Sequence, residues 1–443
     1  MRVVFGFIPL PVFTWLVPLL AICSCGARPP RSAPMRPAVV PLFVAPPMTS
    51  TVMLGIDVLE SEGFASLRGK RLGLLTHPAG VNRHGESTVE VLHRARGLKL
   101  VCLFAPEHGI YGNEAASANV EDTVDARTGL PVYSLHGKNR RPTREQLKTI
   151  DALVIDLQDI GVRSYTYAVA MRYAMDACFL NGVEVIVLDR PNPLGGLKVD
   201  GPVLDRELRS GVGAFPVPYI HGLTIGELAR FAASTPGVMD VPENIRARGR
   251  LTIVPMRGWR RDMTWPDTGL KFIATSPSIC DFGAVVGYAM IGLGCEATGF
   301  NHSVGPPFSF QVISFSGKSR ELLEHDLDAL RLSGLRIQKT TTTDGSGRPT
   351  GGVLVQVADW DTWRPTEISF ELMRLACRYR PPNPFLSLSN TDISKFNKHV
   401  GSTAWWNALR RDGARVDVEG FLRDWRVLAL SYREQTRQFW LYR

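Results

Sequence analysis

Residues 105–112, Ala-Pro-Glu-His-Gly-Ile-Tyr-Gly, place a carboxyl group and an imidazole side by side in the chain. They follow residues 98–104, an apolar run that predicts a buried strand. A carboxylic acid flanked by a proline and a tyrosine can be removed from water, and it then holds a proton for transfer, as a general acid must. We therefore predict Glu107 as a general acid, with His108 orienting it or binding substrate. The alternatives are that Glu107 only pairs with an arginine such as Arg163, and that His108 is structural.

Two more polar loops follow apolar runs of the same kind. Residues 158–163, Gln-Asp-Ile-Gly-Val-Arg, come directly after one run, and residues 189–193, Asp-Arg-Pro-Asn-Pro, come after another. In open α/β sheets, ligands bind beyond the carboxyl ends of the strands. Three polar loops at such positions predict one shared pocket.

These loops supply candidate binding residues, each with a structural alternative. The guanidinium of Arg163 could hold a carboxylate through two parallel hydrogen bonds, or it pairs internally with Asp159. Asp189 binds a ligand hydroxyl or orders its own loop. Asn192, fixed between two prolines, aims its amide at a ligand or only makes a turn. His221 precedes a helix start and is either a ligand-binding or a structural residue.

Strand and helix patterns alternate along the chain between residues 53 and 256, and these elements must position the loops. A helix is predicted at residues 165–180, with Tyr165 and Tyr167 in its first turn. Residues two apart do not share a helix face, so at most one of the two rings can face a pocket. We take Tyr165 as the binding residue. Capping-box sequences predict three more helix starts, at residues 87–90, 143–146 and 224–227. Strands are predicted at residues 71–76, 98–104, 153–157 and 183–188. Short strands alternating with helices predict a parallel sheet covered on both faces.

The domain organisation follows from changes in this pattern. Residues 51–275 are predicted to form a Rossmann-like catalytic domain, and residues 276–443 a smaller α+β auxiliary domain, for an α/β fold class overall. No G-x-G-x-x-G follows the first strand and no P-loop occurs, so neither a dinucleotide nor another cofactor is expected.

The N-terminus has the features of a targeting signal. A basic start and an apolar stretch end in small residues with Cys23 and Cys25, as in a relaxed lipoprotein signal within residues 1–25. Residues 26–50, rich in Pro, Ala and Arg, predict a flexible tether. We expect export, lipidation at one of the two cysteines and anchoring to the bacterial envelope, with the periplasmic face favoured. The alternatives are another exported form, an uncleaved anchor or a misassigned start codon.

The composition excludes some partners. The 443 residues carry a formal net charge of +9, but the basic residues are dispersed and accompany no nucleic-acid-binding motif, so no nucleic-acid partner is expected. The nine histidines include neither H-E-x-x-H nor H-x-H, so no metal site is expected either.

Taken together, the chain resembles the exo-β-N-acetylmuramidase (NamZ-like) family, formerly a domain family of unknown function. The resemblance runs in order from about residue 54 to the end, over long and unusual motifs. These are Gly73-Leu74-Leu75-Thr76 with Gly80-Val81-Asn82, residues 105–109, 156–163, 165–167, 188–196, 200–203 and 221–228, and Phe396-Asn397-Lys398.

The resemblance implies a Rossmann-like catalytic domain with an auxiliary domain. It implies hydrolysis of terminal N-acetylmuramic acid from the non-reducing ends of peptidoglycan fragments, so the partners are muropeptides or disaccharides and, through the N-terminal lipid, the membrane. Such a reaction requires an acid for the leaving oxygen and a second carboxylate or substrate group for the anomeric carbon. Arg163 would then recognise the lactyl carboxylate of muramic acid.

One segment departs from the family pattern. Residues 296–306 lack the usual Arg-Gly-Thr, although Glu296 and Asn301 remain as candidate substrate contacts. If this segment contacts the sugar, this protein differs from the family in its substrate preference or its activity. The competing interpretation is therefore a non-catalytic lipoprotein that binds muropeptides or another acidic sugar. An unrelated hydrolase is disfavoured, because the chain has no G-x-S-x-G elbow.

Overall fold

The computed structural model describes residues 52–112, 121–302, 308–343 and 348–443. The predicted signal and tether, with Cys23 and Cys25, lie outside these ranges. No helix of the described ranges is long and apolar enough to cross a membrane.

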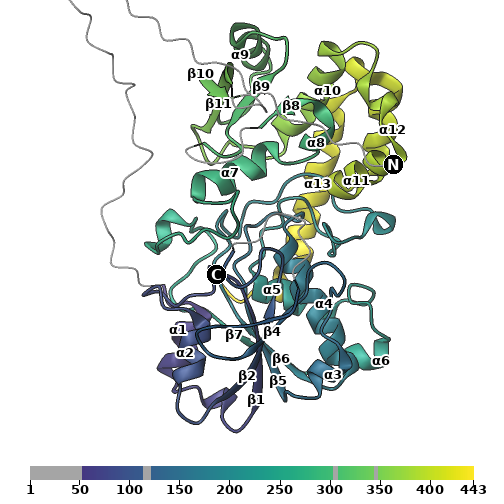
Figure 1. Cartoon of the computed structure of the whole chain (residues 1–443). Helices are drawn as coiled ribbons and strands as arrows, with labels where there is room; N and C mark the ends of the chain where they lie inside the picture. The colour runs from purple at the N-terminus through teal and green to yellow at the C-terminus, as the bar shows by residue number, and fades with distance from the viewer. Residues whose placement is uncertain (1–51, 113–120, 303–307, 344–347) are drawn as a thin grey trace, which may run out of the picture. The chain divides into compact units, whose positions relative to one another are not determined.

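The first half of the described chain is built on a seven-stranded sheet with the order β3-β4-β2-β1-β5-β6-β7 (Figure 1). Every neighbouring pair is parallel except β3 and β4 at one edge. The strands are β1 (Arg71–Thr76), β2 (Lys99–Ala105), β3 (Thr123–Val124), β4 (Pro131–Ser134), β5 (Ala152–Asp156), β6 (Glu184–Leu188) and β7 (Leu251–Val254). The predicted α/β fold with a parallel sheet is confirmed.

Helices cover both faces of this sheet, because alternate strand residues point to opposite sides. Leu153 and Ile155 of β5 belong to one apolar core, whereas Val154 belongs to the other. In Figure 1, α1 and α2 lie on one side of the strands and α4 and α5 on the other. The helices of this half are α1 (Gly55–Ser61), α2 (Thr88–Arg94), α3 (Arg144–Leu147), α4 (Thr166–Leu180), α5 (Ile225–Ser234) and α6 (Glu243–Arg246).

Two of the three predicted capping boxes are present. Thr143 caps α3 and Thr224 caps α5, each with the reciprocal glutamine or glutamate bond. Ser87 caps α2, but Glu90 forms an ion pair with Arg127 instead of closing the box.

The second half contains a four-stranded antiparallel sheet with the order β10-β11-β9-β8, and helices beside it. Its strands are β8 (Phe300–Asn301), β9 (Val312–Phe315), β10 (Leu335–Thr343) and β11 (Pro349–Val357). Its helices are α7 (Phe282–Ile291), α8 (Cys295–Thr298), α9 (Arg320–Asp328), α10 (Glu367–Tyr379), α11 (Asn390–Val400), α12 (Thr403–Asp412) and α13 (Val418–Thr436). Trp405 and Trp425 are buried against Phe370.

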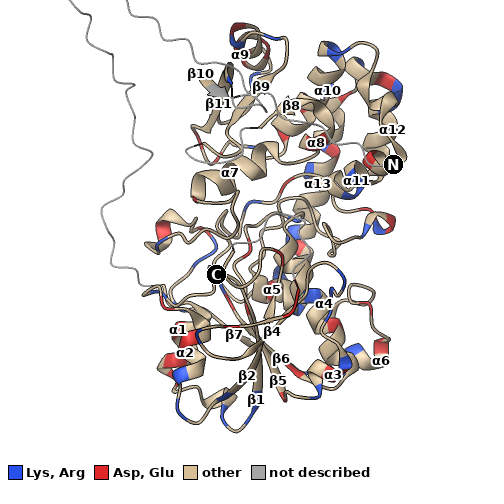
Figure 2. Cartoon of the chain, viewed as in Figure 1, with Lys and Arg blue, Asp and Glu red and all other residues tan. Residues whose placement is uncertain are grey.

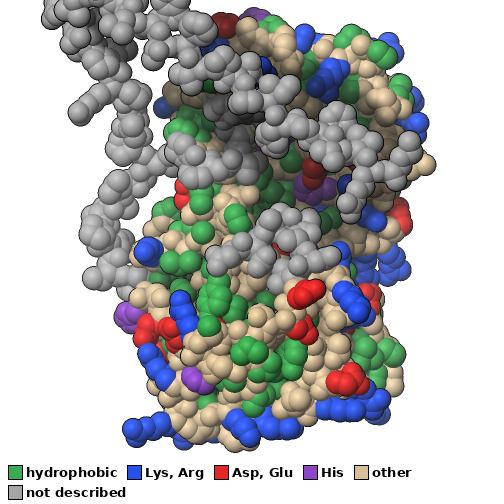
Figure 3. Space-filling view, in the orientation of Figure 1, with side chains coloured by type: hydrophobic (Ala, Val, Ile, Leu, Met, Phe, Trp, Pro, Cys, Tyr) green, Lys and Arg blue, Asp and Glu red, His purple; other side chains and the backbone are tan. Residues whose placement is uncertain are grey.

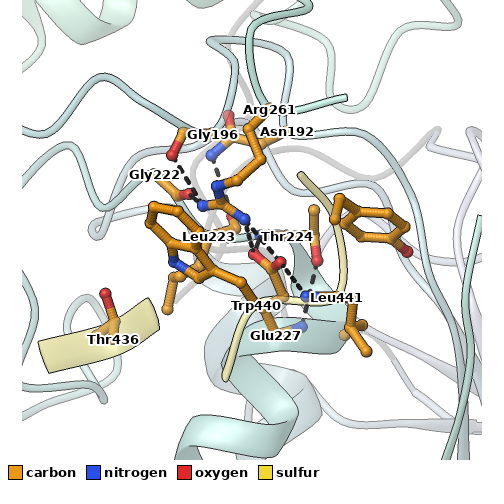
Figure 4. Close-up of polar contacts among 12 residues, drawn as sticks. Asn192, Gly196, Gly222, Leu223, Thr224, Glu227, Arg261, Thr436, Trp440 and Leu441 are labelled. Atoms are coloured by element: carbon orange, nitrogen blue, oxygen red, sulfur yellow. Dashed lines mark hydrogen bonds and ion pairs between the residues drawn. The ribbon is translucent and has the colours of Figure 1, made fainter. Parts of the chain in front are cut away.

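The C-terminal tail returns from α13 to the first half and is held there by a buried ion pair. Arg261 bonds both carboxylate oxygens of Glu227 at 2.7 and 2.9 Å, and the ring of Trp440 covers its guanidinium at 3.8 Å (Figure 4). The main-chain nitrogen of Leu441 donates to the same carboxylate. A buried charge is tolerated only when it is paired and hydrogen-bonded, so the tail completes this interior.

Charged side chains are spread over both halves rather than gathered in one band (Figure 2). On the face seen in Figure 3, the described residues mix basic, acidic and apolar side chains. This dispersion agrees with the charge pattern noted in the sequence.

Candidate active site

The polar loops meet at the carboxyl edge of the parallel sheet because their strands are neighbours. β2, β1, β5 and β6 stand side by side in this order, and their loops are residues 106–112, 77–81, 157–163 and 189–193. The chain continues from β1 to β2 on one side and later returns to β5 on the other. The edge between β1 and β5 is therefore the topological switch point, where open α/β sheets bind ligands.

Glu107 lies in the loop after β2 with its side chain 14% exposed. The Thr166 hydroxyl, at the start of α4, donates to its Oε2 at 2.8 Å, and Nε2 of His136 lies 3.9 Å from its Oε1. His108 beside it is buried and has a φ of +71°, a left-handed conformation that non-glycine residues rarely adopt. A partly exposed carboxyl group held by a hydroxyl and a histidine can exchange a proton with a ligand.

Two aromatic residues, Tyr165 and Tyr167, flank Thr166, the residue that bonds Glu107. Tyr167 packs edge-on against His77 at 4.5 Å and against Tyr165 at 4.9 Å. The Tyr165 hydroxyl donates to the Thr275 side chain at 2.6 Å, and the Tyr167 hydroxyl donates to the Thr275 carbonyl. Both tyrosines are buried, and substrate binding by Tyr165 stays a prediction. Thr275 was not among the residues singled out from the sequence.

His77 joins the loops after β1 and β5. The Gln158 main-chain nitrogen donates to His77 Nε2 at 2.9 Å. Burial, together with the nearby charge of Arg190, lowers the pKa of His77 to about 3, so its imidazole is neutral and can accept this bond. His77 was also missed from the sequence, where only its position after the first strand hinted at a role.

Asp159 and His221 form a buried pair. Nε2 of His221 lies 3.1 Å from Asp159 Oδ2, which also accepts from the Gly161 nitrogen at 2.7 Å. Because the Leu223 nitrogen donates to Nδ1 of His221, the proton of a neutral ring sits on Nε2 and points to Asp159. Within the described ranges, Asp159 Oδ1 has no hydrogen-bond partner. An unfilled buried acceptor is costly, and a water or a ligand hydroxyl would satisfy it.

Asn192 orders the loop that carries it. Its Oδ1 accepts from the Leu194 nitrogen and its Nδ2 donates to the Leu223 carbonyl, both at 3.0 Å. A Cβ on Gly161 would come within 2.3 Å of the same Oδ1, so glycine is required there. The structure therefore supports the turn alternative for Asn192.

The assignment of Asp189 to sugar binding is corrected by its surroundings. The residue is 0% exposed, and its two oxygens accept from the nitrogens of Arg190 and Gly226 and the hydroxyls of Thr224 and Tyr442. Burial raises its pKa to about 6. With these donors in place, Asp189 joins α5 and the C-terminal tail to the sheet.

The assignment of Arg163 to a substrate carboxylate is likewise corrected, as is its alternative pairing with Asp159. Its guanidinium is buried and donates to four main-chain carbonyls, at 2.6 to 3.3 Å. Two of them, Pro202 and Val217, belong to the first half of the chain, and His399 and Val400 belong to α11. Arg163 therefore ties the loop after β5 to the second half.

Comparison with known proteins identifies the family. The family model described as exo-beta-N-acetylmuramidase NamZ, N-terminal, matches residues 72–283 of this chain. The family model for the C-terminal part of NamZ matches residues 286–442. The chain belongs to the NamZ family of exo-β-N-acetylmuramidases. The resemblance drawn from the sequence is confirmed, and the chain is an enzyme of the glycoside hydrolase class.

Similar proteins support this membership over most of the chain. The peptidoglycan beta-N-acetylmuramidase NamZ of Bacillus subtilis (strain 168) is 35% identical over 396 residues, 88% of this chain and 91% of that protein. A DUF1343 family protein from Bacteroides fragilis has a crystal structure with a TM-score of 0.79 and 35% identity, over 88% of this chain and 99% of that one. A second such protein of that organism, at 22% identity and a TM-score of 0.68 over 89% of this chain and 99% of its own, shares the fold.

The segment that departs from the NamZ pattern lies in the second half and begins at α8. Glu296 has a largely exposed side chain 3.2 Å from Nδ1 of His399, whose carbonyl accepts from Arg163. Asn301 pairs with Ser314 in the small sheet. Residues 303–306 of the segment lie outside the described ranges. Contact of Glu296 and Asn301 with substrate stays a prediction.

The described ranges contain no group of three side chains that could hold a metal ion. Independence from metals and cofactors stays a prediction, as do the domain boundary at residue 275 and the division of catalytic and binding roles.

Proposed function

We propose that this NamZ-family protein is an exo-acting β-N-acetylmuramidase, which releases terminal N-acetylmuramic acid from the non-reducing ends of peptidoglycan fragments during cell-wall turnover. Family membership and the B. subtilis relative, whose name specifies a peptidoglycan muramidase, support the reaction class. The observation that carries the proposal is the half-buried carboxyl group of Glu107 at the carboxyl edge of the sheet.

The mechanism assigns the leaving group to Glu107, which protonates the glycosidic oxygen as the bond to the anomeric carbon breaks. The Thr166 hydroxyl bonds one carboxyl oxygen, and the other lies 3.9 Å from Nε2 of His136; these contacts orient the carboxyl group for proton transfer. The positive charge that develops at the anomeric carbon needs a second group. Asp159 offers a carboxylate in the loop after β5, oriented by His221 and Gly161; the substrate's own acetamido group is the alternative. Water then forms the new bond to the anomeric carbon, and its proton returns to the carboxylate of Glu107.

The test is the product released from a fragment with N-acetylmuramic acid at its non-reducing end. We expect free N-acetylmuramic acid from the native protein, and a loss of about 100-fold or more in Glu107→Gln, which keeps the shape but removes the acidic proton. The control is Glu145→Gln, which changes an exposed glutamate in α3. Full activity of Glu107→Gln contradicts the role of Glu107, and cleavage only inside longer chains contradicts the exo mode.

We further propose that the protein is exported and held at the envelope by a lipid on Cys23 or Cys25. A lipoprotein-like ending of the apolar N-terminal stretch and the Pro-rich segment after it support this assignment. One acyl chain binds a membrane only marginally, so stable anchoring requires the two or three chains of a bacterial lipoprotein. Cells labelled with a fatty-acid analogue should label the native protein but not a Cys23→Ala, Cys25→Ala double variant. Labelling of both forms, or of neither, contradicts the anchor.

A further inference from the structure

A second feature of the carboxyl edge has no role in the reaction as described above. A cavity of about 290 Å³ lies beside the loops after β1, β5 and β6, with Ala79, Gln158 and Arg190 in its wall. Ligand pockets commonly measure about 300–1,000 Å³, so this cavity has the size for a monosaccharide rather than a chain. It adjoins the switch point between β1 and β5, where this class of fold binds ligands.

The charged residues that line the cavity are all basic. They are Arg83 and His84 from the turn after β1, Arg190 from the loop after β6, and Lys271. Arg190 is neutralised by a buried ion pair with Asp156. The side chains of Arg83 and Lys271 are exposed, and within the described ranges neither forms a hydrogen bond or an ion pair. Two positive charges without counter-ions therefore remain at the cavity, which favours an anionic ligand.

An aromatic residue provides the apolar part of the wall. Trp265 is buried, its Nε1 donates to the Leu270 carbonyl at 3.2 Å, and its ring packs edge-on against Phe272 at 5.2 Å. These contacts hold the ring in one orientation beside the apolar side chains of Leu54 and Ile273. Small-molecule sites typically combine such a wall with a few charged or polar groups.

The cavity is also coupled to the proposed acid through a short series of contacts. Gln158, in its wall, donates its main-chain N–H to His77. The His77 ring packs against Tyr167, and the preceding residue, Thr166, bonds Glu107. A ligand in the cavity would therefore lie within a few side chains of the carboxyl group that transfers the proton.

We propose that this cavity binds a carboxylate-bearing amino sugar of the muramic acid class, with Arg83 and Lys271 at the carboxylate and Trp265 against the ring. The inference rests on the proposed function and deepens it. It transfers recognition of the lactyl carboxylate from Arg163, whose guanidinium is occupied by carbonyls, to two exposed cations at the neighbouring switch point.

The experiment measures binding of free N-acetylmuramic acid to the full chain by calorimetry, with N-acetylglucosamine, which lacks the lactyl group, as the reference sugar. In Arg83→Ala, Lys271→Ala we expect affinity for N-acetylmuramic acid to fall about tenfold or more, and affinity for N-acetylglucosamine to stay within about twofold. The matched control, Arg96→Ala, Lys99→Ala, removes the same charge from exposed positions at the opposite, amino-terminal edge of the sheet. It should bind both sugars as the native protein does.

Several outcomes would overturn the inference: unchanged affinity in the double variant, an equal loss for both sugars, or the same loss in the control pair. Displacement of the sugar by equimolar inorganic phosphate would also overturn it, because the cavity would then be a general anion site. Hydrolysis by the native protein tests the function separately. Hydrolysis without a binding effect rejects the site alone, whereas charge-dependent binding without hydrolysis rejects the function and leaves the site.

Discussion

Glu107 and Asp189 begin from equivalent places in the sequence and end in opposite environments. Each is the first acidic residue after a buried strand of the same parallel sheet, β2 or β6. Glu107 keeps 14% of its side chain exposed, beside a hydroxyl and a histidine, whereas Asp189 is 0% exposed. Two main-chain nitrogens and two hydroxyls already bond to Asp189.

The difference shows what separates a reactive carboxylate from a structural one at the edge of a sheet. Position relative to the strand differs by only one residue, so the surroundings decide: α5 and the C-terminal tail enclose Asp189, whereas part of the Glu107 side chain stays exposed. Asp189 lies where α5 begins and where the C-terminal tail returns, and both supply donors to it. Arg163 shows the same principle for a cation, because four carbonyls occupy its guanidinium.

The largest effect on stability is expected for Arg163→Ala. Its removal leaves several buried carbonyls without donors, so we expect the free energy of unfolding in urea to fall by at least about 3 kcal/mol. Muramides and matching N-acetylglucosaminides should lose activity equally. The control is Arg68→Ala, which removes an exposed guanidinium whose one hydrogen bond to the described residues is to the Gly63 carbonyl. A loss confined to muramides would restore Arg163 as a substrate residue.

The central comparison is tested by Asp189→Asn against Glu107→Gln. An amide cannot accept at its nitrogen, so Asp189→Asn leaves donors of Arg190 and Gly226 or of Thr224 and Tyr442 unsatisfied. We expect it to lower the free energy of unfolding by about 2 kcal/mol. Glu107→Gln should change stability by less than about 0.5 kcal/mol while it removes activity. Equal losses of stability in the two variants would abolish the distinction.

The pH dependence of stability should reveal the buried His77. Its pKa is lowered to about 3 in the folded state by burial and by Arg190, against an ordinary value of 6.5. Neutral His77 therefore contributes stability that is fully present above pH 6.5 and is lost as the pH falls toward 3. Between pH 6.5 and pH 5 the contribution falls by about 2 kcal/mol. The free energy of unfolding of His77→Gln, measured in urea at pH 6.5 and pH 5, should lack this decrease. If the variant loses as much stability between the two pH values as the native protein does, the role of His77 is contradicted.

The smallest effect is expected at the tail. Tyr442→Phe removes the hydroxyl that donates to Asp189 and accepts from the Met256 nitrogen, but it keeps the ring, which packs edge-on against Trp259 at 5.0 Å. We expect the free energy of unfolding to fall by about 1 kcal/mol. In the Asp189→Asn background the same substitution should have a smaller effect, because the two residues share one hydrogen bond. Full additivity in this double-mutant cycle would show that the bond contributes nothing.

Much of the sheet was predictable because its strands are short, apolar and bounded by turns. The strand Arg71–Thr76 matches its prediction, and the strand before Glu107 is displaced by one residue. The strand Leu335–Thr343 was missed because its run of threonines and charged residues lacks apolar alternation. Helix α7 was not among the predicted elements; its Gly287 lies so close to the carbonyls of Ser309 and Phe310 that a Cβ there would clash with them.

The parallel sheet, the family and the edge at which the polar loops gather can all be read from the sequence, because strand periodicity and the loop motifs are local properties of the chain. The structural roles of individual residues in those loops depend instead on tertiary contacts. The donors to Asp189 come from residues 224, 226 and 442, and two of the carbonyls bound to Arg163 come from residues 399 and 400. Hydrogen bonds between distant segments form only when the chain has folded, and no local pattern encodes them.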